Sequence, residues 1–251
     1  MMKTLSPDIV KTLPLFAGLP EQDKDILLKA GSTRHFARGE HLFLHGDSIA
    51  HFYIICRGTI QLFRENPDGH EKTIDVRIAG QTICKTEILG AALVHQVNAM
   101  ATDDVVVLEF PMTWLMDNAK KNSVFALNLL SAISRYALEA EIEAEHLATM
   151  SATQLVACFL QRICILHDFN PAGFELPYSK TLIASRLGME LETFSRTLSK
   201  LKEQGITVKG THVIIHDLGA IERYVCAHCS VAQDCQTHKI LGEKPAVRKI
   251  I

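Results

Sequence analysis

Residues 178–202 read YSKTLIASRLGMELETFSRTLSKLK, and their apolar side chains recur at helical spacings of three and four. Gly188 stands where a chain must turn sharply between two helices, because glycine adopts backbone angles that other residues avoid. The apolar residues fall on one side of each helix: Leu182, Ile183 and Leu187 before the turn, and Leu191, Phe194, Leu198 and Leu201 after it. The segment therefore predicts a helix-turn-helix near residues 179–202.

The second of these helices carries polar and charged side chains away from its apolar side. The candidate contacts to DNA there are Glu192, Thr193, Ser195, Arg196, Ser199 and Lys200. An arginine can donate two hydrogen bonds to O6 and N7 of guanine, which discriminates by about 1–3 kcal/mol, and a glutamate can accept from cytosine N4 or adenine N6. Ser179, Lys180, Thr181 and Lys200 are placed to meet phosphates, which position a protein without specifying sequence. These residues predict a partner that is double-stranded DNA.

An ordinary exposed helix is the alternative, since Glu192 and Arg196 have the i,i+4 spacing of a surface ion pair. The surroundings of the segment favour the DNA-binding interpretation. Two short runs rich in β-branched residues follow it over 205–216, around Lys209-Gly210. They predict a hairpin of the kind that forms a wing beside a helix-turn-helix.

Between about Thr33 and Phe110 the sequence consists of short runs rich in β-branched and aromatic residues, separated by turn residues. The runs are 51–56, 59–63, 72–78 and 105–110, and Asn66-Pro-Asp-Gly69 marks a hairpin turn. Many short strands at such spacing predict a small antiparallel barrel or sandwich. An amphipathic helix over 21–30 is expected to precede it.

Residues 122–150 contain neither Gly nor Pro, and Phe125, Leu129, Ile133 and Tyr136 recur at helical spacing. A helix of this length would be roughly 43 Å long, which exceeds what one small barrel covers. We therefore expect its apolar stripe to seal a homodimer by coiled-coil packing. A helix packed only within its own chain is the alternative.

These elements predict an α+β fold in four parts. They are a β-roll sensor domain with N-terminal helices (1–121), a dimerisation helix (122–150), a winged helix-turn-helix (151–218) and a tail (219–251). The chain is 47% hydrophobic with a net charge of −2, so DNA binding must rest on local rather than total charge. The absence of a long apolar run and of a secretory leader predicts a cytoplasmic protein without a membrane partner.

The order of these parts resembles the CRP/FNR family of bacterial regulators over about residues 12–218. The run Glu192-Thr-Phe-Ser195-Arg196 is similar to the E-x-x-S-R recognition-helix signature of the FNR branch. The resemblance implies a transcription regulator, with activator function and RNA polymerase as a partner, that reads TTGAT half-sites as an inverted repeat. Glu190 departs from the family's Ser or Thr N-cap; it suits the helix dipole but caps poorly and would repel a nearby phosphate.

Family members that bind cyclic nucleotides hold the phosphate with a Gly-Glu pair and an Arg-Ser pair. Ile83-Cys84 and Val97-Asn98 fall at these positions. Without the arginine a buried phosphate would lack a counter-charge, which argues against cyclic AMP. Haem is a further option within the family, and its possible ligands are His35, His41, His45, His51, His70 and His95.

Three cysteines follow the predicted wing with C-x2-C-x5-C spacing: Cys226, Cys229 and Cys235. Three thiolates suit a [4Fe–4S] cluster or zinc, and the segment resembles the cluster-binding segment of the FNR branch. The candidates for a fourth ligand are Glu139, Glu141, Glu143, Glu145, His146, Asp234 and His238. A sensor of oxygen or nitric oxide is the favoured interpretation; a zinc site with His238, a thiol redox switch and inert cysteines are the alternatives.

The other four cysteines, Cys56, Cys84, Cys158 and Cys164, lie in apolar segments and are expected to be buried hydrophobic residues. Two further functions are alternatives to a regulator. A metal-dependent redox enzyme would use the C-terminal cysteines, yet no acid–base or nucleophile constellation accompanies them. A cyclic-nucleotide-binding protein would need the missing arginine. The sequence therefore predicts that this protein is not an enzyme.

Overall fold

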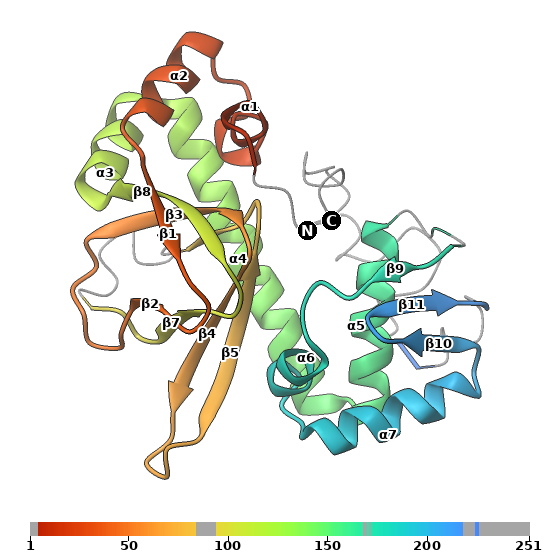
Figure 1. Ribbon diagram of the computed structural model, residues 1–251. Coiled ribbons are helices and arrows are strands. Elements are labelled where there is room, and N and C mark those ends of the chain that lie inside the picture. The colour runs from red at the N-terminus through yellow and green to blue at the C-terminus, as the bar shows by residue number, and fades with distance from the viewer. Residues whose placement is uncertain (1–4, 84–93, 168–169, 171, 218–223, 226–251) are drawn as a thin grey trace. The chain divides into compact units, whose positions relative to one another are not determined.

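The computed structural model describes residues 5–83, 94–167, 170, 172–217 and 224–225. The chain divides into two compact units, with the boundary between Tyr136 and Ala137 (Figure 1). The first unit holds an antiparallel β-roll and the second a small helical domain with a three-stranded sheet. The α+β fold class expected from the sequence is confirmed.

Three short helices precede the roll: α1 (Pro7–Val10), the 3-10 helix η1 (Pro14–Phe16) and α2 (Glu21–Lys29). The side chain of Ser6 caps α1 by accepting a hydrogen bond from the backbone N–H of Ile9. The α2 helix is the one expected over 21–30. These helices bury Val10, Leu15 and Phe16 against the core of the roll.

The roll consists of two antiparallel four-stranded sheets. One has the order β1 (Ser32–Phe36), β8 (Val105–Pro111), β3 (His51–Arg57) and β6 (Thr82–Ile83); the other has the order β2 (His41–Phe43), β7 (Asn98–Ala101), β4 (Thr59–Glu65) and β5 (Glu71–Ile78). The apolar residues of β3 and β8 form the centre of its core, where Ile54, Ile55 and Val107 are fully buried. Burial of such β-branched side chains stabilises the sheets.

Two helices follow the roll, α3 (Met112–Lys121) and the long α4 (Ser123–Thr149), which is the helix expected over 122–150. Within the first unit Phe125 and Leu129 of α4 are buried in the core of the roll. The expectation that this apolar stripe seals a dimer is therefore wrong for these two residues, which pack within their own chain. The Asn128 side chain donates hydrogen bonds to the carbonyl oxygens of Leu15 (3.1 Å) and Ala17 (2.8 Å). These contacts fix the first half of α4 against the roll.

The second unit contains α5 (Ala152–Leu166), β9 (Phe174–Glu175), α6 (Lys180–Arg186), α7 (Leu191–Lys202), β10 (Ile206–Lys209) and β11 (His212–Ile215). Ser151 and Gln154 form a capping box at the start of α5. The strands form an antiparallel sheet in the order β10-β11-β9. The helix-turn-helix and its wing expected from the sequence are thus present, and β9 is an additional strand. No helix among the described residues is long and apolar enough to span a membrane.

Candidate nucleic-acid interface

The helix-turn-helix is formed by α6, a turn at Gly188 and α7. The side chain of Ser179 accepts a hydrogen bond from the N–H of Leu182 and caps α6. Gly188 has φ +68°, the left-handed conformation that a side chain disfavours, so the sharp turn depends on glycine. Glu190 is the N-cap of α7 and makes no side-chain capping hydrogen bond. The weak cap anticipated for Glu190 is therefore observed.

One side of α7 anchors the helix in the core of the second unit. Phe194 and Leu201 are completely buried and Thr197 is 5% exposed. Figure 1 shows α7 bordered by α6 and by the wing strand β10. Leu191 is the exception to the expected apolar side: it is 39% exposed, because the core ends before the first turn of α7. Periodicity alone placed it wrongly among the anchors.

The opposite side of α7 presents a row of exposed side chains: Glu192, Ser195, Arg196, Ser199 and Lys200. Arg196 Nε donates to the backbone carbonyl oxygen of Glu192 at 3.4 Å rather than to its carboxylate. The alternative, a surface ion pair between Glu192 and Arg196, is therefore not the contact that the structure shows. Ser199 Oγ donates to the carbonyl oxygen of Ser195 at 3.1 Å. The structure thus brings Glu192, Ser195 and Arg196 together on one accessible surface.

The remaining predicted contacts lie beside this row or at the start of α6. Thr193 is half-buried on α7, between the anchored and the exposed sides. Ser179 and Thr181 are exposed, and Lys180 is half-buried. The first turn of a helix carries unpaired N–H groups and a partial positive charge, so it suits a phosphate. The structure places all three side chains in that turn or at its cap.

Behind α6 lies an ion pair that the sequence did not reveal. Arg186 donates from Nε and one terminal nitrogen to the two carboxylate oxygens of Glu143 in α4, both at 3.2 Å. Its other terminal nitrogen donates to the Tyr178 hydroxyl at 3.0 Å. Both side chains of the ion pair are largely covered, at 19% and 26% exposure. A two-point contact of this kind fixes orientation as well as distance, so it holds α6 on the second half of α4.

The wing is tied to the preceding loop by His212. Its Nδ1 lies 2.8 Å from Glu175 Oε1 of β9, and its Nε2 lies 2.9 Å from the carbonyl oxygen of Ala172. Gly173 has φ +92°, and a Cβ there would collide with the Val213 carbonyl and the His212 ring. Glycine at 173 therefore allows the backbone to approach the wing closely enough for both hydrogen bonds.

Comparison with known proteins matches both units to described families. The family model of the cyclic nucleotide-binding domain matches residues 33–122, and that of the Crp-like helix-turn-helix domain matches residues 141–224. A solved structure from Ruegeria pomeroyi, provisionally described as a cyclic nucleotide binding protein, is 30% identical. The match covers 87% of this chain and 96% of the Ruegeria chain, with a TM-score of 0.59. The chain belongs to the CRP/FNR family.

Two curated relatives agree with this assignment. The cyclic AMP receptor protein of Thermus thermophilus is 26% identical over 201 residues, which are 80% of this chain and 91% of the relative. The fumarate and nitrate reduction regulatory protein of Escherichia coli is 28% identical over 193 residues, 73% of this chain and 74% of the relative. This CRP/FNR protein is a DNA-binding transcription regulator and not an enzyme, as predicted.

The contacts of His212 predict that the stability of the wing depends on pH. Two acceptors face the ring, and only the imidazolium has two N–H groups to donate. The contact with Glu175, and then that with Ala172, raises the pKa of His212 above its ordinary value of 6.5. The hydroxyl of Thr211, and then His212, lowers the pKa of Glu175, so this carboxylate stays ionised near neutral pH. Because the folded-state pKa of His212 is raised, its contribution is full below about pH 6.5 and is lost as pH rises through the raised value.

We expect the backbone amides of β11 to exchange faster with solvent, after correction for the intrinsic rate, when the pH rises from about 6 to about 8.5. Lys209 is paired with His212 across β10 and β11. The His212→Gln variant retains an amide donor but does not titrate, so its β11 amides should show no such step. A step of equal size in the variant would contradict this origin.

The interior of the roll contains a second ion pair that the sequence did not reveal. Asp75 and Arg77 of β5 form an ion pair, with side chains 10% and 8% exposed. The Arg77 guanidinium lies 4.6 Å from the centre of the Tyr136 ring in α4. Among the described residues Arg77 is the only buried lysine or arginine. The cation buried in the β-roll of this CRP/FNR protein is thus already neutralised by a carboxylate.

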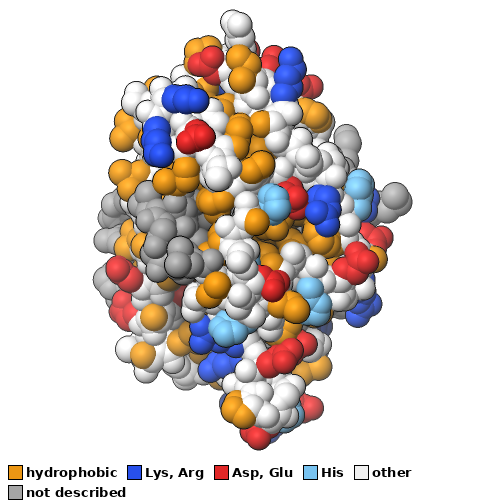
Figure 2. All heavy atoms as spheres, turned by 90° about the vertical axis from the view of Figure 1, so that its left-hand side faces the viewer, with side chains coloured by type: hydrophobic (Ala, Val, Ile, Leu, Met, Phe, Trp, Pro, Cys, Tyr) orange, Lys and Arg blue, Asp and Glu red, His pale blue; other side chains and the backbone are white. Residues whose placement is uncertain are grey.

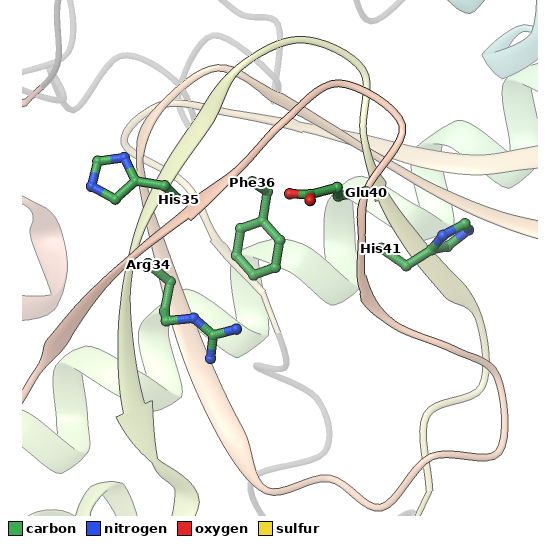
Figure 3. Close-up of a pocket in the computed structure, with 5 residues that line it drawn as sticks. All are labelled: Arg34, His35, Phe36, Glu40 and His41. Carbon is green, nitrogen blue, oxygen red and sulfur yellow. The ribbon is translucent and has the colours of Figure 1, made fainter.

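The candidate haem ligands are dispersed over the roll. His95 is 3% exposed and stacks on Phe43, with ring centres 3.5 Å apart, while His51 Nε2 lies 3.4 Å from Glu109 Oε1. A surface hollow of about 380 Å³ is lined by Arg34, His35, Phe36, Glu40 and His41. In Figure 3 the Phe36 ring lies between Arg34 and Glu40, while His35 and His41 point to opposite sides. Figure 2 shows basic, acidic and histidine side chains interspersed with hydrophobic ones on the face that it presents. His35 and His41 thus line one hollow with rings that point apart, and the structure does not gather the six candidate histidines at one site.

Three cysteines lie among the described residues. Cys56, Cys158 and Cys164 are buried as expected, and burial raises the pKa of the Cys56 thiol to about 11, so it stays protonated. Cys84 and the predicted ligands Cys226, Cys229 and Cys235 lie outside the described residues. Within those residues, no three His, Cys, Asp or Glu side chains form a group that could hold a metal ion.

Proposed function

We propose that this regulator reads an inverted repeat of TTGAT-like half-sites with α7. The observation that carries the proposal is the exposed row of Glu192, Ser195 and Arg196, opposite the buried anchors Phe194 and Leu201. An arginine in such a row can bind guanine O6 and N7, and the glutamate can accept from cytosine N4 or adenine N6. Ser179, Lys180, Thr181, Thr193, Ser199 and Lys200 then position the helix on the phosphates.

Binding to an inverted repeat requires a symmetric dimer, and α4 offers a surface for one. Leu127 and Leu130 are 62% and 54% exposed on α4, far more than large apolar residues of a buried helix face. They begin a stripe of exposed positions at alternating spacings of three and four: Leu127, Leu130, Ser134, Ala137, Glu141, Ala144 and Ala148. This is the heptad spacing of a two-stranded coiled coil, and its small residues permit close approach. A second copy of the chain is the partner that supplies an identical stripe.

The signal that we propose is oxygen or nitric oxide, sensed by an iron–sulfur cluster on Cys226, Cys229 and Cys235. Thiolates are the usual ligands of such clusters, and the C-x2-C-x5-C spacing brings three of them into one short segment. The similarity to a regulator named for fumarate and nitrate reduction supports a redox signal. A cluster of this kind would supply the reactivity toward oxygen or nitric oxide. RNA polymerase is the expected partner in activation.

The described residues narrow the choice of a fourth ligand. The Glu143 carboxylate is held by Arg186 through two hydrogen bonds, and His146 is 8% exposed. Glu145 is exposed and Glu139 is half-buried, so these two remain the accessible candidates on α4. Glu141 is exposed as well, but it lies in the stripe that we propose to pack against a second copy. Asp234 and His238 lie outside the described residues. Zinc, haem and a thiol switch remain the alternatives to the cluster.

Cyclic AMP is not the effector that we propose. A cyclic nucleotide carries a phosphate, and a buried phosphate needs a positive side chain. The buried Arg77 is paired with Asp75, so a phosphate would have to displace that carboxylate. Asn98, at one of the positions that hold phosphate in the family, accepts a hydrogen bond from the N–H of His45 at 2.8 Å. These contacts support a signal other than a cyclic nucleotide.

The absorption spectrum of the protein purified without oxygen tests the proposed signal. We expect a broad visible band that bleaches in air, with parallel loss of affinity for the TTGAT repeat. Cys229→Ala should lack the band, whereas Cys158→Ala, which changes a buried cysteine, should keep it. A sharp Soret band would instead indicate haem, and a colourless protein containing zinc would indicate a zinc site. Either result would contradict the iron–sulfur proposal.

A further inference from the structure

The second half of α4 lies in the same compact unit as the helix-turn-helix, because the boundary between the units falls inside α4, after Tyr136. The buried apolar core of that unit is built from α5, α6, α7 and the three strands. Among the described residues, none of the members of this core comes from α4. The hold of α4 on the helix-turn-helix therefore depends on contacts outside this core.

Arg186, the last residue of α6, makes contacts that join α4 to the helix-turn-helix. It donates two hydrogen bonds, both of 3.2 Å, to the two carboxylate oxygens of Glu143 in α4. Its remaining terminal nitrogen donates to the Tyr178 hydroxyl at 3.0 Å, and the centre of the Tyr178 ring lies 6.1 Å from that of Phe159 in α5. One guanidinium thus links α4 to α6 and, through Tyr178, to α5.

An apolar contact between the same elements has a different physical character. Leu147 of α4 lies beside the turn between α6 and α7, since a Cβ placed on Gly188 would be 3.9 Å from its Cδ2. Hydrophobic attraction is non-directional, so this contact permits sliding. A planar guanidinium that binds both oxygens of a carboxylate holds one orientation. The ion pair of Arg186 with Glu143 is therefore the contact that fixes the rotation of the helix-turn-helix relative to the second half of α4.

We propose that Arg186 is a positioning residue that sets the spacing between half-sites which this regulator accepts. The inference rests on the proposed reading of an inverted repeat by a dimer that α4 seals. In such a dimer the two recognition helices must meet the groove about one helical turn apart. Each inserted base pair moves the second half-site by about 3.4 Å and rotates it by about 35°. A helix-turn-helix fixed on α4 can follow neither change, whereas a loosely held one can follow both.

Arg186→Met removes the guanidinium and keeps an unbranched side chain. We would measure dissociation constants by fluorescence anisotropy on duplexes whose spacer is lengthened or shortened one base pair at a time, and on a duplex with a single half-site. The wild-type protein should bind best at one spacing and lose affinity on either side of it. The variant should lose about tenfold at that spacing, discriminate less between spacings, and bind the single half-site as the wild type does.

Further variants separate orientation from charge. Arg186→Lys keeps the positive charge but cannot make the two-point contact, so it should relax the spacing in the same way. Glu143→Ala combined with Arg186→Met should cost no more than Arg186→Met alone, because both changes remove the same contact. Arg34→Met is the matched control, since Arg34 forms an ion pair with Glu109 within the roll, at 3.3 Å. It should leave the spacing profile unchanged.

An Arg186→Met protein with the spacing profile of the wild type would overturn the inference. An equal loss on the single half-site would also overturn it, because the change would then act on the helix-turn-helix itself. Tighter binding to the repeat would do the same, because the contact would then hold α7 away from DNA. A wild-type protein that binds a scrambled duplex as tightly as the repeat, or that is monomeric, would instead contradict the proposed function. The two failures are therefore distinguishable.

Discussion

The Arg196→Ala variant is expected to lose about 1–3 kcal/mol of binding free energy per half-site on the TTGAT repeat and to lose little on random DNA. The physical reason is that the guanidinium is exposed on α7 and can donate two hydrogen bonds to one guanine. Its contact within the protein is a single long hydrogen bond to the carbonyl oxygen of Glu192. Removal of the side chain should therefore leave the fold intact, which a thermal melt would verify.

Lys180→Ala is the matched control for a contact that positions without specifying. Lys180 lies in the first turn of α6, where a phosphate is favoured. Its loss should weaken binding to the repeat and to random DNA by about the same factor. It should also reduce the slope of log affinity against log salt concentration by about one. Titrations of both variants with both duplexes separate the two roles. Equal losses on repeat and random DNA in both variants would show that Arg196 does not read a base.

The double variant Leu127→Glu and Leu130→Glu is expected to be monomeric and to bind the inverted repeat at least about 100-fold more weakly. These side chains are 62% and 54% exposed and begin the heptad stripe of α4. Two carboxylates on each copy would have to be desolvated in a coiled-coil seam without partners, which opposes association. Sedimentation velocity measures the mass of the particle. The affinities for duplexes with one and with two half-sites, compared with each other, measure how far the two subunits still bind together.

Ile26→Glu controls for the general effect of adding a charge at an exposed apolar position. Ile26 is 58% exposed on α2, away from the α4 stripe, so this variant should sediment and bind as the wild-type protein does. Both variants alter exposed positions, so their folds should be retained. A double variant that still sediments as a dimer would place the subunit interface elsewhere.

The sequence predicted those elements whose local pattern and tertiary environment agree. The strands β3, β4, β5 and β8 combine β-branched residues with turn residues at their ends, and each was expected within two residues of its observed bounds. The strands β1 and β7 were not predicted individually. Their sequences, STRHF and NAMA, carry weak strand preference, and pairing with β8 and β4 determines them. Such pairing joins residues far apart in the chain, so a local pattern does not reveal it.

The Asp75–Arg77 ion pair shows that a strand can be predicted with correct bounds while the burial of its polar side chains is missed. Along β5 the polar Asp75 and Arg77 alternate with the apolar Ile74 and Val76, and such alternation is typical of a strand whose polar side chains face solvent. In the structure the pairing of β4 with β5 shifts register between Leu62 and Phe63. Ile74 is 48% exposed, whereas Asp75, Val76 and Arg77 are all buried. The irregular pairing places Asp75 opposite Leu62 and Arg77 opposite Ile60, and a local sequence pattern does not contain this register.

The exposed row of α7 was predicted more completely than the contacts that hold the helix-turn-helix in place. Spacing along α7 identified Glu192, Ser195 and Arg196, since a regular helix places them on one side whatever surrounds it. The exposure of Leu191 depends on where the core ends, and the contact of Arg186 with Glu143 joins helices 43 positions apart. Neither follows from helical periodicity. The exposed row follows from helical spacing within α7, whereas the contacts that orient α6 and α7 depend on residues far apart in the chain.

A crystal structure of the protein bound to a TTGAT inverted repeat tests the reading of DNA by α7 most directly. We predict that Glu192, Ser195 and Arg196 enter the major groove, with the Arg196 guanidinium within hydrogen-bond distance of guanine O6 and N7. The second subunit should place the same residues in the groove about 34 Å away. A complex in which these three side chains face solvent or the other subunit, while a different element occupies the groove, would contradict the account.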